Sequence, residues 1–133
     1  GGGICNFSVK TGLKMTDCTI NGNIAKIVVS NVSYFAWGGG FYNNDTNPTL
    51  TNCTINGNKG RGGGGIYSIS SSNDETKLIN CKIQGNEATG IASYSGEVVG
   101  NGGGVANHNG KIWGKCALYR SFRLSLVQFS KKY

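Results

Sequence analysis

A nine-residue pattern of apolar and polar positions occurs three times along the chain. It reads apolar, any residue, Asn or Asp, Cys, any residue, Ile, any residue, Gly, Asn, and the copies occupy residues 15–23, 50–58 and 78–86. Residues two apart share one face of a strand, so the Cys and the Ile of each copy point together and the residue between them points away. Each copy therefore predicts a short β-strand with one buried face.

The first apolar residue of each copy lies three positions before the Cys and cannot share its face in a straight strand. The chain is therefore predicted to bend at the intervening polar residues Asp17, Asn52 and Asn80. The Gly-Asn pair that closes each copy predicts a second turn, because glycine adopts positive φ without steric cost.

A run of three glycines followed by an apolar residue precedes each copy. These runs occupy residues 1–4, 38–41 and 63–66, and a fourth run occupies residues 102–105. The fourth run predicts a degenerate fourth copy, in which Trp113, Cys116 and Leu118 stand for the apolar residue, the Cys and the Ile. The Cys positions of successive copies lie 35, 28 and 35 residues apart, a variation that loops on one face of the fold can absorb.

Bends that recur once in each repeat build a coil with flat sides. The sequence therefore predicts an all-β fold, a parallel β-helix (β-solenoid) of about four rungs. Like residues of successive rungs are expected to stack inside it in three columns, Met15/Leu50/Leu78/Trp113, Cys18/Cys53/Cys81/Cys116 and Ile20/Ile55/Ile83/Leu118.

Rungs about 4.8 Å apart place identical residues directly over one another. Asn23, Asn58 and Asn86 are then predicted to form a ladder of side-chain amide hydrogen bonds along the coil. The glycine runs are expected to carry the backbone round a corner where a side chain would clash with the next rung. Packing alone explains why these residues recur. The repeated asparagines, cysteines, isoleucines and glycines are therefore predicted to stabilise the fold rather than to take part in binding or catalysis.

The pairing of Gly-Gly-Gly-apolar runs with Asn-Cys-x-Ile-x-Gly-Asn segments resembles the repeats of right-handed parallel β-helix surface proteins. These include the passenger regions of autotransporter adhesins and polymorphic outer-membrane proteins. The resemblance covers residues 1–118. It implies a right-handed coil and a secreted or surface-displayed stalk or adhesin, with no catalytic residues shared across the family.

The chain has 133 residues and a net charge of +7, which is unevenly distributed. Residues 1–110 sum to +1, and the rest comes from a set without acids: Lys111, Lys115, Arg120, Arg123, Lys131 and Lys132. Nucleic-acid binders usually present basic residues along a stripe or a motif. These six instead decorate a terminal segment, so nucleic acid is not an expected partner. No apolar stretch reaches the roughly 20 residues of a membrane-spanning helix.

Five cysteines raise the question of disulfides. Four of them occupy equivalent positions in the repeats, and stacked side chains point in parallel, which is poor geometry for a bridge. Buried free thiols are therefore favoured, with disulfides as the alternative. No Cys-x-x-Cys spacing occurs and His108 is the only histidine, so neither a metal nor another cofactor is expected.

The rival function class binds or cleaves polysaccharides, as pectate-lyase-like β-helices do. That chemistry requires carboxylates clustered on one outer face, as an acid and base pair or as calcium ligands. Asp17 occupies a turn position that Asn fills in later copies, whereas Asp45 and the Asp74-Glu75 pair lie in loops on one side of the coil. Loop solvation accounts for them better, so no enzymatic activity and no catalytic residue is expected.

Residues 119–133 carry no repeat motif and form a second segment after the repeats of residues 1–118. In this segment Phe122, Leu124, Leu126 and Phe129 are interspersed with polar and basic residues, a pattern typical of a strand with one apolar face. It is predicted to be a strand, a cap or a subunit-joining segment.

Two functions follow from these features. In the first, the chain is an extracellular structural protein that self-associates head to tail into fibres, with residues 119–133 completing the sheet of the next subunit. In the second, it is an adhesive cell-surface module whose loops at residues 24–37 and 87–101 contact other surface proteins or glycans. Residue 1 is Gly rather than Met, which predicts a processed chain or a piece of a longer one.

Overall fold

The computed structural model describes residues 1–7, 12–26, 36–71, 74–89, 92–94, 97–99, 103–108 and 111–119. The regular structure in these ranges consists of β-strands. The strands are β1 (Ile4–Phe7), β2 (Lys14–Thr16), β3 (Thr19–Asn21), β4 (Phe41–Asn44), β5 (Thr49–Thr51), β6 (Thr54–Asn56), β7 (Lys59–Gly60), β8 (Ile66–Ile69), β9 (Glu75–Gln84), β10 (Glu87–Ala88), β11 (Ala92–Tyr94), β12 (Glu97–Val99), β13 (Val105–His108) and β14 (Lys111–Tyr119).

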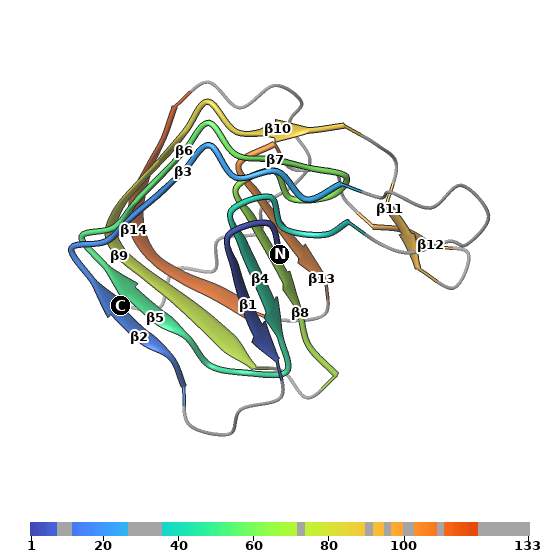
Figure 1. Cartoon of the computed structure of the whole chain (residues 1–133). Coiled ribbons are helices and arrows are strands. Elements are labelled where there is room, and N and C mark those ends of the chain that lie inside the picture. The colour runs from blue at the N-terminus through green and yellow to red at the C-terminus, as the bar shows by residue number, and fades with distance from the viewer. Residues whose placement is uncertain are drawn as a thin grey trace.

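The strands that follow the glycine runs form one sheet. It has four parallel strands in the order β1-β4-β8-β13, which lie side by side in Figure 1. Its register aligns the residue after each glycine run, so Ile4 pairs with Phe41, Phe41 with Ile66 and Ile66 with Val105. The glycine runs thus mark equivalent positions of successive repeats.

The nine-residue copies form a second, six-stranded sheet. The first copy supplies β2 and β3, and the second supplies β5 and β6. Residues 78–84 of the third copy lie in the single long strand β9, with which β14 also pairs in parallel. Asp17, Asn52 and Asn80 have φ values of 53°, 54° and 51°, in the left-handed region that Asn and Asp tolerate better than other non-glycine residues. The predicted bends at these three residues are confirmed, and they curl the sheet into a half-barrel (Figure 1).

The core lies between these two sheets. Leu50, Ile55, Leu78 and Ile83 of the curled sheet are completely buried, and they form one cluster with Phe41 and other residues of the four-stranded sheet. Full burial of each such side chain contributes about 1.5–3 kcal/mol to folding. The apolar positions of the nine-residue pattern therefore provide one side of the main core.

The glycine runs are needed because the chain passes very close to its neighbours there. A Cβ atom on Gly39 would lie 2.3 Å from the carbonyl oxygen of Gly64, and one on Gly64 would lie 2.4 Å from the carbonyl oxygen of Glu87. Such approaches to backbone are sterically forbidden. The expected clash of any side chain with the neighbouring repeat is confirmed at these two positions.

The predicted parallel β-helix of about four rungs is wrong as a description of the architecture. The described strands belong to separate sheets of four, six, two and two strands, and the pair β11-β12 is antiparallel. The segment between the third and fourth repeats contributes to the difference, because it inserts the antiparallel pair β11-β12, which has no counterpart in the other described segments. What the structure retains of the prediction is the all-β class and the parallel pairing of the repeats.

The fourth copy is also aligned differently from the prediction. Trp113 does not continue the column of Met15, Leu50 and Leu78, because Gly114 pairs with Leu78 and Trp113 pairs with Lys77. The register shifts between Lys115 and Cys116, after which Cys116 pairs with Cys81 and Leu118 with Ile83 as predicted. The fourth copy therefore has no residue opposite Asn80. The prediction aligned Trp113 with Leu78 because it assumed the same spacing before the cysteine in all four copies.

The segments predicted as contact loops are only partly described. Residues 87–101 include β10, β11 and β12 and are therefore not a plain loop. In the other segment, Ile24 and Trp37 form isolated parallel bridges to Lys59 and Gly62. Residues 27–35 lie outside the described residues, as do residues 120–133 with the apolar positions of the predicted joining segment.

The close approach at Gly64 predicts a large loss of stability for Gly64→Ala. The added methyl group must displace the backbone of Glu87, and we expect the free energy of unfolding to fall by roughly 3 kcal/mol. Gly22→Ala is a suitable control, because its Cβ would meet no atom within 4 Å and only its φ of 67° opposes the change. Its expected cost is about 1–2 kcal/mol. Urea unfolding of both variants measures the difference, and equal losses would contradict the packing argument.

Candidate functional site

A ladder of asparagine side chains links the first three repeats. The Nδ2 atom of Asn23 donates to Oδ1 of Asn58 at 3.0 Å, and Nδ2 of Asn58 donates to Oδ1 of Asn86 at 3.0 Å. The backbone N–H groups of Asn23 and Asn58 donate to the same oxygens, each at 2.9 Å. Each Oδ1 thus accepts two hydrogen bonds from the preceding repeat.

The second N–H of each amide in this ladder points to the preceding repeat. Nδ2 of Asn58 donates to the carbonyl oxygen of Ile20, and Nδ2 of Asn86 donates to that of Ile55, both at 2.9 Å. Asn58 and Asn86 are almost completely buried, so every one of these bonds avoids the cost of an unpaired polar group. The amides lie against the third glycine of each run, where a Cβ atom on Gly40 would lie 2.9 Å from Nδ2 of Asn58.

A second ladder runs along the bends of the curled sheet. Nδ2 of Asn80 donates to Oδ1 of Asn52 at 2.9 Å, and Nδ2 of Asn52 donates to Oδ1 of Asp17 at 3.0 Å. Here the later repeat donates to the earlier one, and the three residues are exposed. The sequence predicted bends at these positions but not their hydrogen bonds. Asp17, in the first copy, is the first member of this ladder and accepts from Asn52.

A buried polar column crosses the four-stranded sheet. Nδ2 of Asn6 donates to Oδ1 of Asn43 at 2.9 Å, and Nδ2 of Asn43 donates to Oγ of Ser68 at 3.2 Å. Thr46 and Thr76 complete the network, with Thr46 Oγ1 donating to Asn43 Oδ1 and Thr76 Oγ1 lying 3.0 Å from Ser68 Oγ. Sequence reasoning missed this column, although Asn or Ser occurs two residues after the apolar residue of every glycine run.

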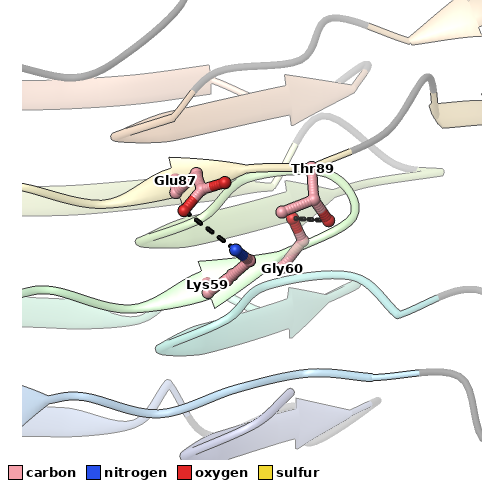
Figure 2. A network of polar contacts seen from close by, with 4 residues as sticks. All are labelled: Lys59, Gly60, Glu87 and Thr89. Atoms are coloured by element: carbon pink, nitrogen blue, oxygen red, sulfur yellow. Dashed lines mark hydrogen bonds and ion pairs between the residues drawn. The ribbon is translucent and has the colours of Figure 1, made fainter.

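Figure 2 shows a smaller contact between the second and third repeats, on the pair of strands β7 and β10. Lys59 Nζ lies 3.1 Å from Glu87 Oε2, and Thr89 Oγ1 donates to the carbonyl oxygen of Gly60 at 3.2 Å. The two charged side chains are 47% and 52% exposed, and exposed ion pairs contribute about 0–1 kcal/mol. This contact is a minor support for the stacking.

The acids considered for catalysis are engaged in turns. Oδ1 of Asp45 accepts from the backbone N–H and from Oγ of Ser71, and Oδ1 of Asp74 accepts from Nδ2 of Asn47. The backbone N–H of Glu75 donates to Oδ1 of the same asparagine. Among the described residues, no three His, Cys, Asp or Glu side chains gather in a way that could hold a metal ion. These contacts suit turn-forming roles.

The cysteines of the first three copies are free thiols, as is Cys5. Their Sγ atoms donate to main-chain carbonyl oxygens, as Cys53 does to Thr51 at 3.3 Å and Cys81 to Leu50 at 3.3 Å. Burial raises the pKa of the Cys81 thiol above its ordinary value of 9.0. Cys53 and Cys81 are small members of the core, and Cys18 packs against it. For Cys116 and Leu118 the structure describes the backbone pairing alone.

Each strand of the first repeat has one long side that no described strand pairs with. Within the described residues, β1 pairs only with β4, β2 only with β5 and β3 only with β6. We call the free long sides of β1, β2 and β3 the first-repeat edge. At the other end, β13 pairs with β8 and β14 pairs with β9.

The first-repeat edge also exposes one end of the core. Ile4, Leu13, Met15 and Cys18 are only partly buried where they pack against the core cluster. Their counterparts one repeat further, such as Leu50 and Cys53, are buried. Asn23 and Asp17 are the first members of the two ladders, and both belong to the first repeat. The first repeat therefore combines partly exposed apolar side chains, polar ladder ends and the edges of its strands. This edge is the candidate functional site.

Comparison with protein-family models, with curated proteins and with solved structures finds no match. Any functional conclusion therefore has to come from the residues themselves. The described part of the chain contains no helix with the length and apolar character needed to traverse a lipid bilayer.

The ladder predicts unequal effects for two asparagine substitutions. Asn58→Ala removes the Oδ1 atom that accepts two hydrogen bonds from Asn23, and it takes one side-chain donor away from both Asn86 Oδ1 and the Ile20 carbonyl. We therefore expect a loss of roughly 3 kcal/mol in the free energy of unfolding. Asn23→Ala, at the half-exposed end, is expected to cost about 1 kcal/mol. Chemical denaturation measures both, and a larger loss for Asn23→Ala would argue against the ladder.

The raised pKa of Cys81 predicts a dependence of stability on pH. The native thiol keeps its proton at pH values where the unfolded chain releases it, so stability falls as pH rises through about 9. In Cys81→Ala this contribution is absent, and the stability advantage of the natural protein over the variant should shrink between about pH 8 and pH 10. Urea unfolding of both proteins across this pH range measures the advantage, and an advantage that does not shrink would contradict the prediction.

Proposed function

We propose that the protein is an extracellular structural or adhesive component that associates with other copies of itself through the open edges of its parallel sheets. The observation that carries this proposal is the first-repeat edge. It presents strand sides that pair with no other described strand, together with one end of the core and the ends of two side-chain ladders.

The sequence of this edge supports pairing with another chain. Soluble proteins usually protect edge strands with charged residues, proline or bulges. β1 reads Ile-Cys-Asn-Phe and β3 reads Thr-Ile-Asn, so neither carries a charge or a proline. β2 contributes Lys14, the one charged residue within these three strands. The edge therefore has the features of strands that pair rather than of strands that avoid pairing.

The half-buried core residues give the same edge an apolar driving force. Phe7 and Ile24 of the first repeat are 60% and 62% exposed, and they add to the partly buried Ile4 and Met15. Covering such side chains stabilises an association by about 25 cal/mol for each Å² of apolar surface removed from water. Backbone hydrogen bonds would fix the direction of the added strand.

The extracellular setting and the adhesive alternative rest on the resemblance of the glycine runs and cysteine-containing segments to surface-protein repeats. The turn contacts of Asp45 and Asp74 provide no support for polysaccharide cleavage.

Blocking one edge N–H tests the proposal. In the later repeats, the N–H of Thr54 donates to the Cys18 carbonyl and that of Lys82 to the Cys53 carbonyl. By this repetition, the N–H of Thr19 faces the first-repeat edge. Thr19→Pro removes it without breaking an internal bond, whereas Thr19→Ala keeps it.

We expect the natural chain and Thr19→Ala to grow with concentration in light scattering and to form filaments in electron micrographs. Thr19→Pro should stay monomeric. A natural chain that remains monomeric at every concentration overturns the proposed self-association.

A further inference from the structure

We infer that the first-repeat edge binds a parallel strand of another polypeptide that carries this chain's own repeat sequence, and that Asn23 selects the asparagine of that strand. The partner is defined by its chemistry, an extended segment of the type Thr-Ile-x-Gly-Asn. The inference goes beyond the proposed self-association, because it specifies which strand sequence the edge recognises and is tested without a second copy.

The two junctions between the first three copies show how such a strand is held. At each junction the asparagine that closes the earlier copy directs its backbone N–H and its Nδ2 to Oδ1 of the next asparagine, at 2.9 and 3.0 Å. The later asparagine directs its own Nδ2 to the isoleucine carbonyl of the earlier copy, at 2.9 Å in both cases. The same three contacts therefore occur twice at the same distances.

Backbone hydrogen bonds accompany these amide contacts. At the first junction the N–H of Thr54 donates to the carbonyl of Cys18, and the N–H of Lys59 donates to the carbonyl of Asn23. Equivalent bonds occur at the second junction. Side-chain and backbone contacts thus fix one register and one parallel direction for each added strand.

The first-repeat edge presents the same groups to a strand that the described part of the chain does not supply. Thr19 and Ile24 occupy the register positions of these two backbone donors in the first copy, so their N–H groups face outward. Among the described residues no donor reaches Oδ1 of Asn23, and only one N–H of its amide is used. The edge therefore repeats the receiving side of each internal junction.

The bend ladder also reaches this edge with an acceptor. Nδ2 of Asn52 donates to Oδ1 of Asp17, and Asp17 has no N–H in its side chain to offer to a further strand. The group placed beside this carboxylate on the outer side must be a donor. The asparagine that precedes the cysteine in the repeat sequence can provide it.

The four-stranded sheet imposes the same demand independently. Asn6 is 7% exposed and uses its Nδ2 on Asn43 and Thr46. No donor in the described ranges reaches Oδ1 of Asn6, so the buried polar column also has an acceptor oxygen at its first-repeat end. A buried acceptor without a donor is unfavourable, and a donor from a partner removes that cost. Both ladders and the column therefore require donors at this edge.

These acceptors give the edge its preference for an asparagine-containing strand. A strand with alanine over Asn23 would keep its backbone contacts and lose the Nδ2 donor, which is expected to weaken binding about fivefold. A strand in the opposite direction, or slipped by one residue, would place its amide away from Asn23.

Titration of the ¹⁵N-labelled full chain with a synthetic peptide tests the inference. The peptide has the sequence of residues 49–60, with alanine in place of its cysteine to prevent oxidation. A matched peptide also carries alanine in place of its last asparagine. Nuclear magnetic resonance spectra are recorded below the protein concentration at which light scattering detects association.

We expect saturable shifts of the amide signals of Thr19 and Ile24. A spin label at the amino end of the peptide should broaden the signal of Thr16 more than that of Ala25, as parallel pairing requires. The matched peptide should bind about fivefold more weakly.

Substitutions at the edge test the selection by Asn23. Asn23→Ala should weaken binding of the first peptide at least tenfold and remove the difference between the two peptides, because alanine has no Oδ1 to accept from the amide. Asn21→Ala is the matched control. It removes an exposed amide from the same strand β3, and it should change neither the affinity nor the difference between the peptides.

Absence of saturable binding, shifts confined to other parts of the molecule, broadening in the opposite direction or equal affinity for both peptides would each overturn the inference. These outcomes leave the proposed self-association standing, because it is measured on the natural chain alone. Peptide binding by a chain that stays monomeric at every concentration would retain the inference and overturn self-association.

Discussion

The in-register stacking of like residues is the constraint on which the rest of this structure depends. An asparagine can satisfy its buried amide only if the next repeat places another asparagine at the same height. The glycine runs then have to leave room for those amides, and the apolar residues of the same repeats are brought into one core. A shift of one repeat by a single residue would break all three arrangements together, so they reinforce one register.

Much of the fold could be predicted from the sequence, because residues that stack on one another in space recur in the same order in each repeat of the chain. The bends at Asp17, Asn52 and Asn80 followed from the odd spacing between an apolar residue and a cysteine. The closed coil did not follow, since the segments between repeats have no shared pattern that fixes their path. The fourth copy was misaligned because a missing residue near Lys115 leaves no signal when the neighbouring motif is also degenerate.

The candidate site was harder to predict than the fold. Repetition identifies what the interior repeats have in common, whereas the site depends on what differs at the ends. Asp17 in place of Asn, and partial exposure of Ile4 and Met15 where equivalent residues are buried, have meaning only once the strand order is known. The polar column from Asn6 to Ser68 was present in the sequence, but short alternating strands gave no reason to assign it to the interior.

The two ladders run in opposite senses along the stack. The Asn23 ladder donates from earlier to later repeats, and the Asn52 ladder donates from later to earlier ones. Each row of aligned amides carries a dipole along the stacking direction, comparable in origin to the aligned peptides of a helix. Because the two rows oppose each other, their dipoles largely cancel. Adding repeats would therefore add little to the electrostatic field at the two ends of the stack. Charged side chains at those ends, such as Asp17, would then dominate the attraction of other molecules to them.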